Sequence, residues 1–102
     1  MSRLEQLKSL VEQDPGNSFL RYGLAMEYRN LGEIEAAVNE FRALMQADPN
    51  YAAAYFHGGQ TLEMMGRPEE AREVYQQGVE VASRQGNQHA RNEMQAALDM
   101  LG

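Results

Sequence analysis

Residues 14–49 read DPGNSFLRYGLAMEYRNLGEIEAAVNEFRALMQADP, and this stretch decides the fold. It opens with Asp14-Pro15 and closes with Asp48-Pro49, the same pair 34 residues later. The interval continues beyond it, because Leu31-Gly32 returns as Met65-Gly66. A fixed interval of this size is typical of a helix–turn–helix unit that stacks on copies of itself. The sequence therefore predicts an all-α fold, an α–α superhelix of antiparallel helix pairs.

Boundary signals divide the chain into six predicted helices. A capping box at Ser2 begins the first helix, and Pro15 follows its end because proline disfavours helical geometry in the residue before it. Gly32, Gly66 and Gly86 stand where a helix ends on a left-handed residue. We expect a single domain over residues 1–102: a leading half-repeat helix at 1–15, a first repeat at 18–51, a second repeat at 52–85 and a closing helix at 87–101.

The composition is that of a small acidic globular protein. The chain has 102 residues, a hydrophobic fraction of 43% and a formal net charge of −6. Such a charge repels phosphate backbones and anionic lipids, so we expect neither nucleic acid nor a membrane as a partner. The chain contains no cysteine, which excludes disulfides and thiolate chemistry and fits a reducing compartment. We therefore predict a cytoplasmic protein, and the excess of arginine over lysine favours a bacterial source.

The repeated residues resemble the tetratricopeptide repeat, whose units are antiparallel helix pairs with a period of 34 residues. The resemblance implies that one set of residues packs the helices together: Leu24, Ala25, Tyr28, Gly32, Ala37, Phe41 and Pro49 in the first repeat, and Tyr55, Gly59, Leu62, Gly66, Ala71 and Tyr75 in the second. Arg21 replaces the aromatic residue usual in the first repeat, and Gly58 and Gly78 replace larger residues in the second. We therefore expect looser packing in the second repeat.

The resemblance also implies that the first helix of each pair lines a concave groove on which peptides lie. Its inward positions are rich in aromatic residues, which give contact area at low entropy cost, and in methionine, which adapts to varied shapes. We predict a groove for an amphipathic helix or an extended apolar peptide. The residues are Phe19, Tyr22, Met26, Arg29, Asn30, Phe56, His57, Gln60 and Met64, with Gly23, Ala53 and Glu63 beside them and Arg91, Met94 and Leu98 added by the closing helix.

Two other interpretations of this apolar set stay open. Aromatic residues at helical spacing also arise from core packing alone. A second copy of the chain can cover the same groove, which makes a homodimer. A clamp of lysines and asparagines for a C-terminal carboxylate, present in some members of the family, is not expected here, because Tyr22, Met26 and His57 occupy the corresponding places.

The sequence offers little chemistry for an enzyme. Glu69, Glu70 and Glu73 form an acidic cluster that a hydrolase could use, but they stand at a helix start, where acids favour the helix dipole. Nothing apolar surrounds them to raise a carboxyl pKa. His57 and His89 lack the spacing of a metal site. We therefore expect a non-enzymatic protein–protein interaction scaffold without cofactor or metal, whose partner the sequence does not identify.

Overall fold

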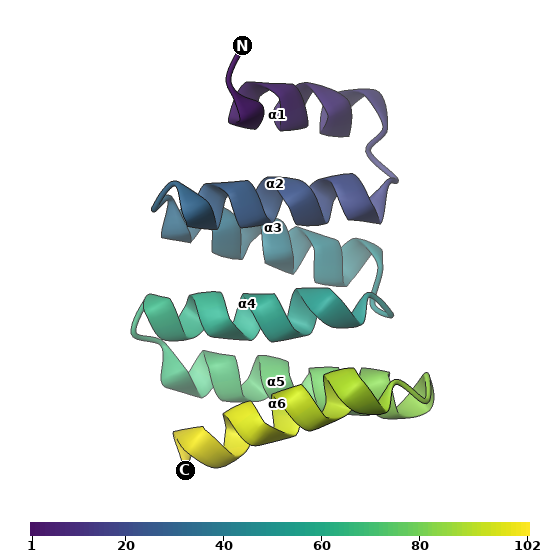
Figure 1. Ribbon diagram of the computed structural model, residues 1–102, viewed down its shortest axis with the longest axis vertical. Coiled ribbons are helices and arrows are strands. Elements are labelled where there is room, and N and C mark those ends of the chain that lie inside the picture. Colours follow the sequence, from purple (N-terminus) through teal and green to yellow (C-terminus); the bar gives the residue numbers. More distant parts are fainter.

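The computed structural model covers residues 1–102 and consists of six helices (Figure 1). Their bounds are Arg3–Gln13 for α1, Ser18–Asn30 for α2, Ile34–Ala47 for α3, Ala52–Met64 for α4, Pro68–Arg84 for α5 and Gln88–Leu101 for α6. No residue lies in a strand, which confirms the predicted all-α fold. None of the helices combines the length and the apolarity needed to cross a bilayer.

The helices begin and end at residues with clear local causes. Ser2 and Glu5 close the predicted capping box at the start of α1. The side chains of Asn17 and Asn87 accept hydrogen bonds from backbone N–H groups at the starts of α2 and α6, at 3.1 Å in both cases. A glycine in the left-handed conformation ends each of three helices, as predicted: Gly32 (φ +80°), Gly66 (φ +74°) and Gly86 (φ +69°).

Helices adjacent in the sequence pack side by side and form two layers (Figure 1). In this view α2, α4 and α6 lie in front, and α3 and α5 lie behind them. The stack is elongated, with extents of 42 × 29 × 19 Å, and the two termini lie at its opposite ends. The front layer therefore presents one shared face to which alternate helices contribute.

Two hydrophobic clusters form the core. The first joins α2, α3 and α4 through Ala25, Ala37, Phe41, Leu44 and Ala54. The second runs from α3 to α6 through Val38, Tyr55, Leu62, Ala71, Tyr75, Val81, Ala82 and Met94. Among the other residues assigned to packing by the resemblance, Leu24 and Gly59 are buried and Tyr28 is half-buried, whereas Gly32, Pro49 and Gly66 lie in turns.

Hydrogen bonds tie the turn between α3 and α4 to both repeats. The Ser18 hydroxyl at the start of α2 donates to Asp48 Oδ2 at 2.7 Å. The Tyr55 hydroxyl on α4 donates to the Pro49 carbonyl at 2.8 Å. The repeated Asp-Pro pair thus does more than end a helix, because it fixes how the start of α2 meets the start of α4.

Glycines inside two helices make room for bulky neighbours. A Cβ on Gly78 would lie 2.2 Å from Met94 Sδ and 2.6 Å from Tyr55 Cβ. A Cβ on Gly59 would lie 2.3 Å from the ring of Tyr75. Both Tyr75 and Met94 are fully buried. The prediction of looser packing in the second repeat is therefore wrong, because large side chains fill the space beside these glycines.

Arg21, which departs from the family pattern, is half of an ion pair inside the first repeat. Its Nη1 lies 3.1 Å from Glu40 Oε2, and the two side chains are 22% and 24% exposed. One period later the same two positions hold Tyr55 and Val74. The first repeat thus has an ion pair at two positions where the second repeat has Tyr55 and Val74.

Candidate functional site

The predicted groove residues lie on α2 and α4, in the front layer of the stack (Figure 1). None of the nine is fully buried. We call this surface the α2–α4 face, and its residues are Phe19, Tyr22, Met26, Arg29, Asn30, Phe56, His57, Gln60 and Met64. Phe19 is 71% exposed, Met64 is 58% exposed, and Asn30 is exposed, whereas the others are half-buried.

Aromatic rings join the two helices of this face. The ring of Tyr22 on α2 lies 5.6 Å from the ring of His57 on α4 and 5.7 Å from the ring of Tyr51. His57 in turn lies 5.2 Å from Phe56, with the ring planes at 67°. The Tyr22–His57 and Phe56–His57 pairs are edge-to-face, an arrangement that stabilises ring pairs beyond the area they bury. The rings therefore form a fixed, partly exposed floor between α2 and α4.

Tyr22 also belongs to the packing of the protein. Its ring meets that of the buried Phe41 at 6.4 Å, and burial raises the pKa of its hydroxyl. Met26 packs against the same core cluster, and Phe56 packs against the second. The core-packing interpretation thus applies in part to these three side chains, whereas Phe19 and Met64 are exposed and packing gives no reason for them.

A polar contact forms a second link across the face. Arg29 Nη1 on α2 donates to Gln60 Oε1 on α4 at 3.3 Å. The ion pairs of the structure do not include Arg29, so its guanidinium lacks a carboxylate partner. The Gln60 amide thus holds the Arg29 side chain in place but does not neutralise its positive charge.

His57 is the titratable group in the middle of the face. Its Nδ1 is buried and has no hydrogen-bond partner. Burial lowers the pKa of His57, the positive charge of Arg29 lowers it further, and the negative charge of Glu93 opposes the shift. The imidazole is therefore neutral at neutral pH, and a buried nitrogen without an acceptor makes its protonation costly.

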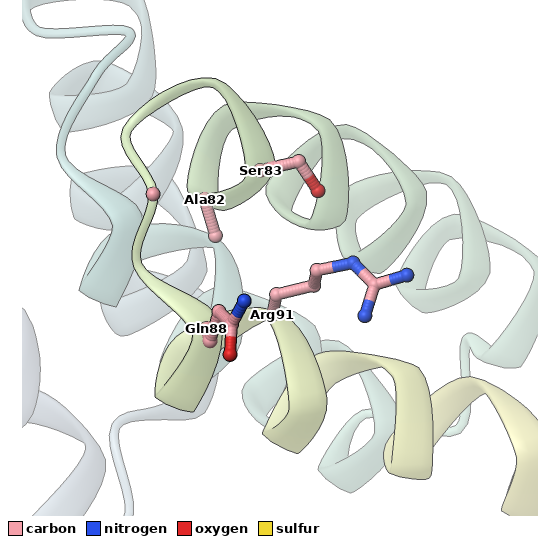
Figure 2. Close-up of a pocket in the computed structure, with 5 residues that line it drawn as sticks. Ala82, Ser83, Gln88 and Arg91 are labelled. Carbon is pink, nitrogen blue, oxygen red and sulfur yellow. The ribbon is translucent and has the colours of Figure 1, made fainter.

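The prediction that the closing helix adds Arg91, Met94 and Leu98 to the groove is wrong. The first residues of α2 and α4 are 34 positions apart, but those of α4 and α6 are 36 apart. With this shift, Met94 is fully buried and Leu98 packs against the second core cluster. The Arg91 side chain extends along the space between α5 and α6 (Figure 2). Sequence reasoning missed Glu93, which stands 36 positions after His57 and affects its pKa.

The remaining inward positions are less informative. Gly23 and Ala53 are half-buried. Glu63 is exposed, and its carboxylate accepts a hydrogen bond from the hydroxyl of the buried Tyr75. Glu63 is thus occupied by a contact within the second repeat.

The two hollows in the surface lie away from the α2–α4 face. One, of about 230 Å³, sits at the turn between α5 and α6 and is lined by Ala82, Ser83, Gly86, Gln88 and Arg91 (Figure 2). The other, of about 280 Å³, lies between α3 and α5 and is lined by Arg42, Met45, Gln46, Glu70, Glu73, Val74 and Gln77. The α2–α4 face is therefore an open surface, suited to an elongated guest more than to an enclosed small molecule.

The acidic cluster at the start of α5 consists of solvated side chains. Glu70 pairs with Arg42 and lies 3.9 Å from Arg67, and Glu69 lies 3.9 Å from Arg72. No three His, Asp or Glu side chains gather as a metal site would require. The arginines around these carboxylates give them a structural use, and nothing in their surroundings supports the hydrolase hypothesis.

The sequence model of the tetratricopeptide repeat family matches residues 28–97. Together with the stacked helix pairs, this match shows that the chain belongs to that family. Its members are helical repeat proteins, and the fold is that of a protein–protein interaction scaffold.

Similar proteins include both sequence relatives and solved structures. The chain is 29% identical over 98 residues to TPR repeat-containing protein PA0015 of Pseudomonas aeruginosa, a match that covers 96% of this chain and 93% of that protein. The solution structure of BPP2914 from Bordetella parapertussis is 30% identical, with a TM-score of 0.84, over 99% of this chain and 88% of that one. PcrH, solved with the chaperone binding region of PopD, has a TM-score of 0.90 at 18% identity, over 96% and 74% of the two chains, and shares the fold.

Proposed function

We propose that this protein binds an extended, partly apolar segment of another protein across the α2–α4 face. The observation that carries the proposal is the exposure of Phe19 and Met64, 71% and 58%, on the same face as a fixed ring floor. Phe19 lies in the first turn of α2 and Met64 at the end of α4, and exposed apolar side chains on one surface tend to mark a binding site. Tyr22, Phe56 and His57 would supply rigid contact area to the guest.

The polar residues of the face would orient the guest. Gln60 and Asn30 offer amide groups on the same two helices as the rings, and Arg29 is already held against Gln60 at 3.3 Å. A guest backbone that passes over them can form hydrogen bonds without any large change in the protein, because the repeat scaffold is pre-organised. The mode of binding would thus combine an apolar floor with a polar edge.

The comparisons support the class of activity. PcrH, which shares this fold, is solved in complex with a region of PopD, so a stack of this shape can hold a segment of another protein. A second copy of the chain as the occupant remains the alternative, and sedimentation equilibrium across concentrations separates the two. A bacterial source and a cytoplasmic location also remain proposals from the composition.

Selection from a random peptide library displayed on phage tests the proposal, because it finds ligands for a partner of any identity. Enriched peptides would be synthesised and titrated into isotope-labelled protein, and amide chemical shifts would be followed by NMR. We expect the largest shifts in residues 19–30 and 53–64. Shifts confined to the hollow between α3 and α5, or to the turn between α5 and α6, would refute the α2–α4 face as the site.

A further inference from the structure

Two charges of opposite sign are left without a full partner beside the ring floor. Most arginines pair with carboxylates: Arg3 with Glu27, Arg21 with Glu40, Arg42 and Arg67 with Glu70, and Arg72 with Glu69. Arg29 pairs only with an amide. Glu93 pairs only with His89, at 3.1 Å, and that contact is an ion pair only when the imidazole is protonated. Arg29 thus has no carboxylate partner and Glu93 has no arginine or lysine partner, so both charges are open to an outside partner.

These two charges flank His57. Arg29 lies on α2 and Glu93 on α6, and α4 with His57 runs between those helices (Figure 1). The pKa of His57 responds to both, downward with Arg29 and upward with Glu93. Arg29 donates a hydrogen bond to Gln60, three residues after His57 on α4, and α6, which carries Glu93, packs against α4, so both charged residues lie on helices that contact the helix of His57. The front layer thus carries a cation, a ring floor and an anion in that order.

We infer that the front layer selects guests by the order of their charges. The guest would place an acidic side chain at Arg29, an apolar side chain on the ring floor and a basic side chain at Glu93. This inference rests on the proposed function. Packed helices lie about 8–10 Å apart, so the path from α2 to α6 is roughly 20 Å. An extended chain covers that path in about six residues, which sets the spacing between the acid and the base.

The side chain of Glu93 supports a role toward a guest. It is 41% exposed, so a guest can reach it, and it lies on α6, which packs against α4. The protein as a whole has a net charge of −6, which attracts basic segments from a distance. Arg29 then prevents indiscriminate binding, because a guest that is basic along its whole length would be repelled at α2.

The test is phage selection on the wild type and on two charge variants, Arg29→Glu and Glu93→Lys. Wild-type selection should enrich peptides with an acid and a base on the two sides of an apolar residue. Selection on Arg29→Glu should remove the preference for the acid, and selection on Glu93→Lys should remove the preference for the base. Arg84→Glu and Glu80→Lys are matched controls, because they change the net charge equally at exposed positions of α5.

Direct titration then gives the size of the effect. One selected peptide and a version with its acid and base exchanged would be measured by fluorescence anisotropy. The wild type should bind the selected peptide about fivefold more tightly than the exchanged one, as expected for exposed charge pairs. The double variant Arg29→Glu/Glu93→Lys should prefer the exchanged peptide. Equal binding of the two peptides, or an unchanged preference in the double variant, would overturn the inference.

The proposed function and this inference fail in different ways. If the peptides bind Phe19→Ala/Met64→Ala as tightly as the wild type, the α2–α4 face is not the site, and both ideas fall. If peptide affinity depends on Phe19 and Met64 but is the same for the wild type and both charge variants, the α2–α4 face is the site and the inference of charge order is wrong.

Discussion

Gly78→Ala and Gly58→Ala form a matched pair of substitutions whose effects on stability should have opposite signs. Both glycines are buried inside helices, and alanine in place of glycine gains about 1 kcal/mol of helix propensity. Their surroundings differ. The nearest atom to a Cβ at position 58 would be Phe41 Cβ at 3.4 Å, an ordinary contact, whereas position 78 would bring it 2.6 Å from Tyr55 Cβ.

The loss of stability in Gly78→Ala depends on which atoms around the added Cβ can move. The sulfur of Met94, 2.2 Å from the added Cβ, is near the end of a flexible side chain. Tyr55 Cβ is attached directly to the backbone of α4, so α4 and α5 must separate. Overpacking costs about 1–3 kcal/mol, and this contact belongs in the upper half of that range. After the gain in helix propensity, we expect a net destabilisation of about 1–2 kcal/mol.

Urea unfolding followed by far-ultraviolet circular dichroism measures both variants. Gly78→Ala should lower the free energy of unfolding and, in a thermal scan, reduce Tm by about 4–16 °C, given the entropy of unfolding of a domain of this size. Gly58→Ala should leave stability unchanged or raise it by up to about 1 kcal/mol. If both variants are stabilised alike, the close contact of Gly78 with α4 and α6 is not a feature of the native protein.

Further predictions concern titration and the ion pair of the first repeat. Because burial lowers the pKa of His57 in the folded chain, the unfolded chain binds this proton more readily, so stability should fall as pH drops below about 6.5 toward the folded-state pKa. His57→Gln should lose less stability than the wild type in that window, with His89→Gln as the exposed control; equal losses would contradict this account. A double-mutant cycle of Arg21→Ala and Glu40→Ala should give a coupling of about 0.5–1 kcal/mol that shrinks at high salt, and a coupling of zero would show that the 3.1 Å contact adds nothing.

Local signals in the sequence predicted the fold well. The capping box at Ser2 and the glycines after α2, α4 and α5 act through a few neighbouring residues, so they can be recognised without the tertiary structure. The repeat interval then indicated that these units stack. Phe19 and Met64, two of the inward positions implied by the family pattern, are exposed, and their place in a binding groove stays a prediction.

The orientation of α6 could not be predicted in the same way. α5 has 17 residues and α3 has 14, because no proline stops α5 and Ser83 stands where Pro49 would recur. The longer helix delays α6 by two residues, which rotates its faces by about 200° at about 100° per residue. Met94 therefore points into the core, and the neighbouring Glu93 is exposed on α6.

The packing around Gly78 could not be predicted from the sequence either. A missing side chain at Gly78 suggests a void when only the family pattern is considered. The space is in fact taken by Met94, a residue 16 positions later whose burial depends on the shifted start of α6. Such compensation between distant residues is a property of the packed core, and local sequence does not encode it.

The affinity of a phage-selected peptide for Phe19→Ala/Met64→Ala tests the central claim most directly. These side chains are exposed and lie outside the core clusters, so the variant should keep its stability within about 0.5 kcal/mol of the wild type. Peptide affinity should fall at least about tenfold, as expected when two apolar contacts with the guest are removed. Leu10→Ala on α1, where the side chain is 43% exposed, should leave affinity unchanged. Undiminished affinity of the double variant would show that the guest binds elsewhere.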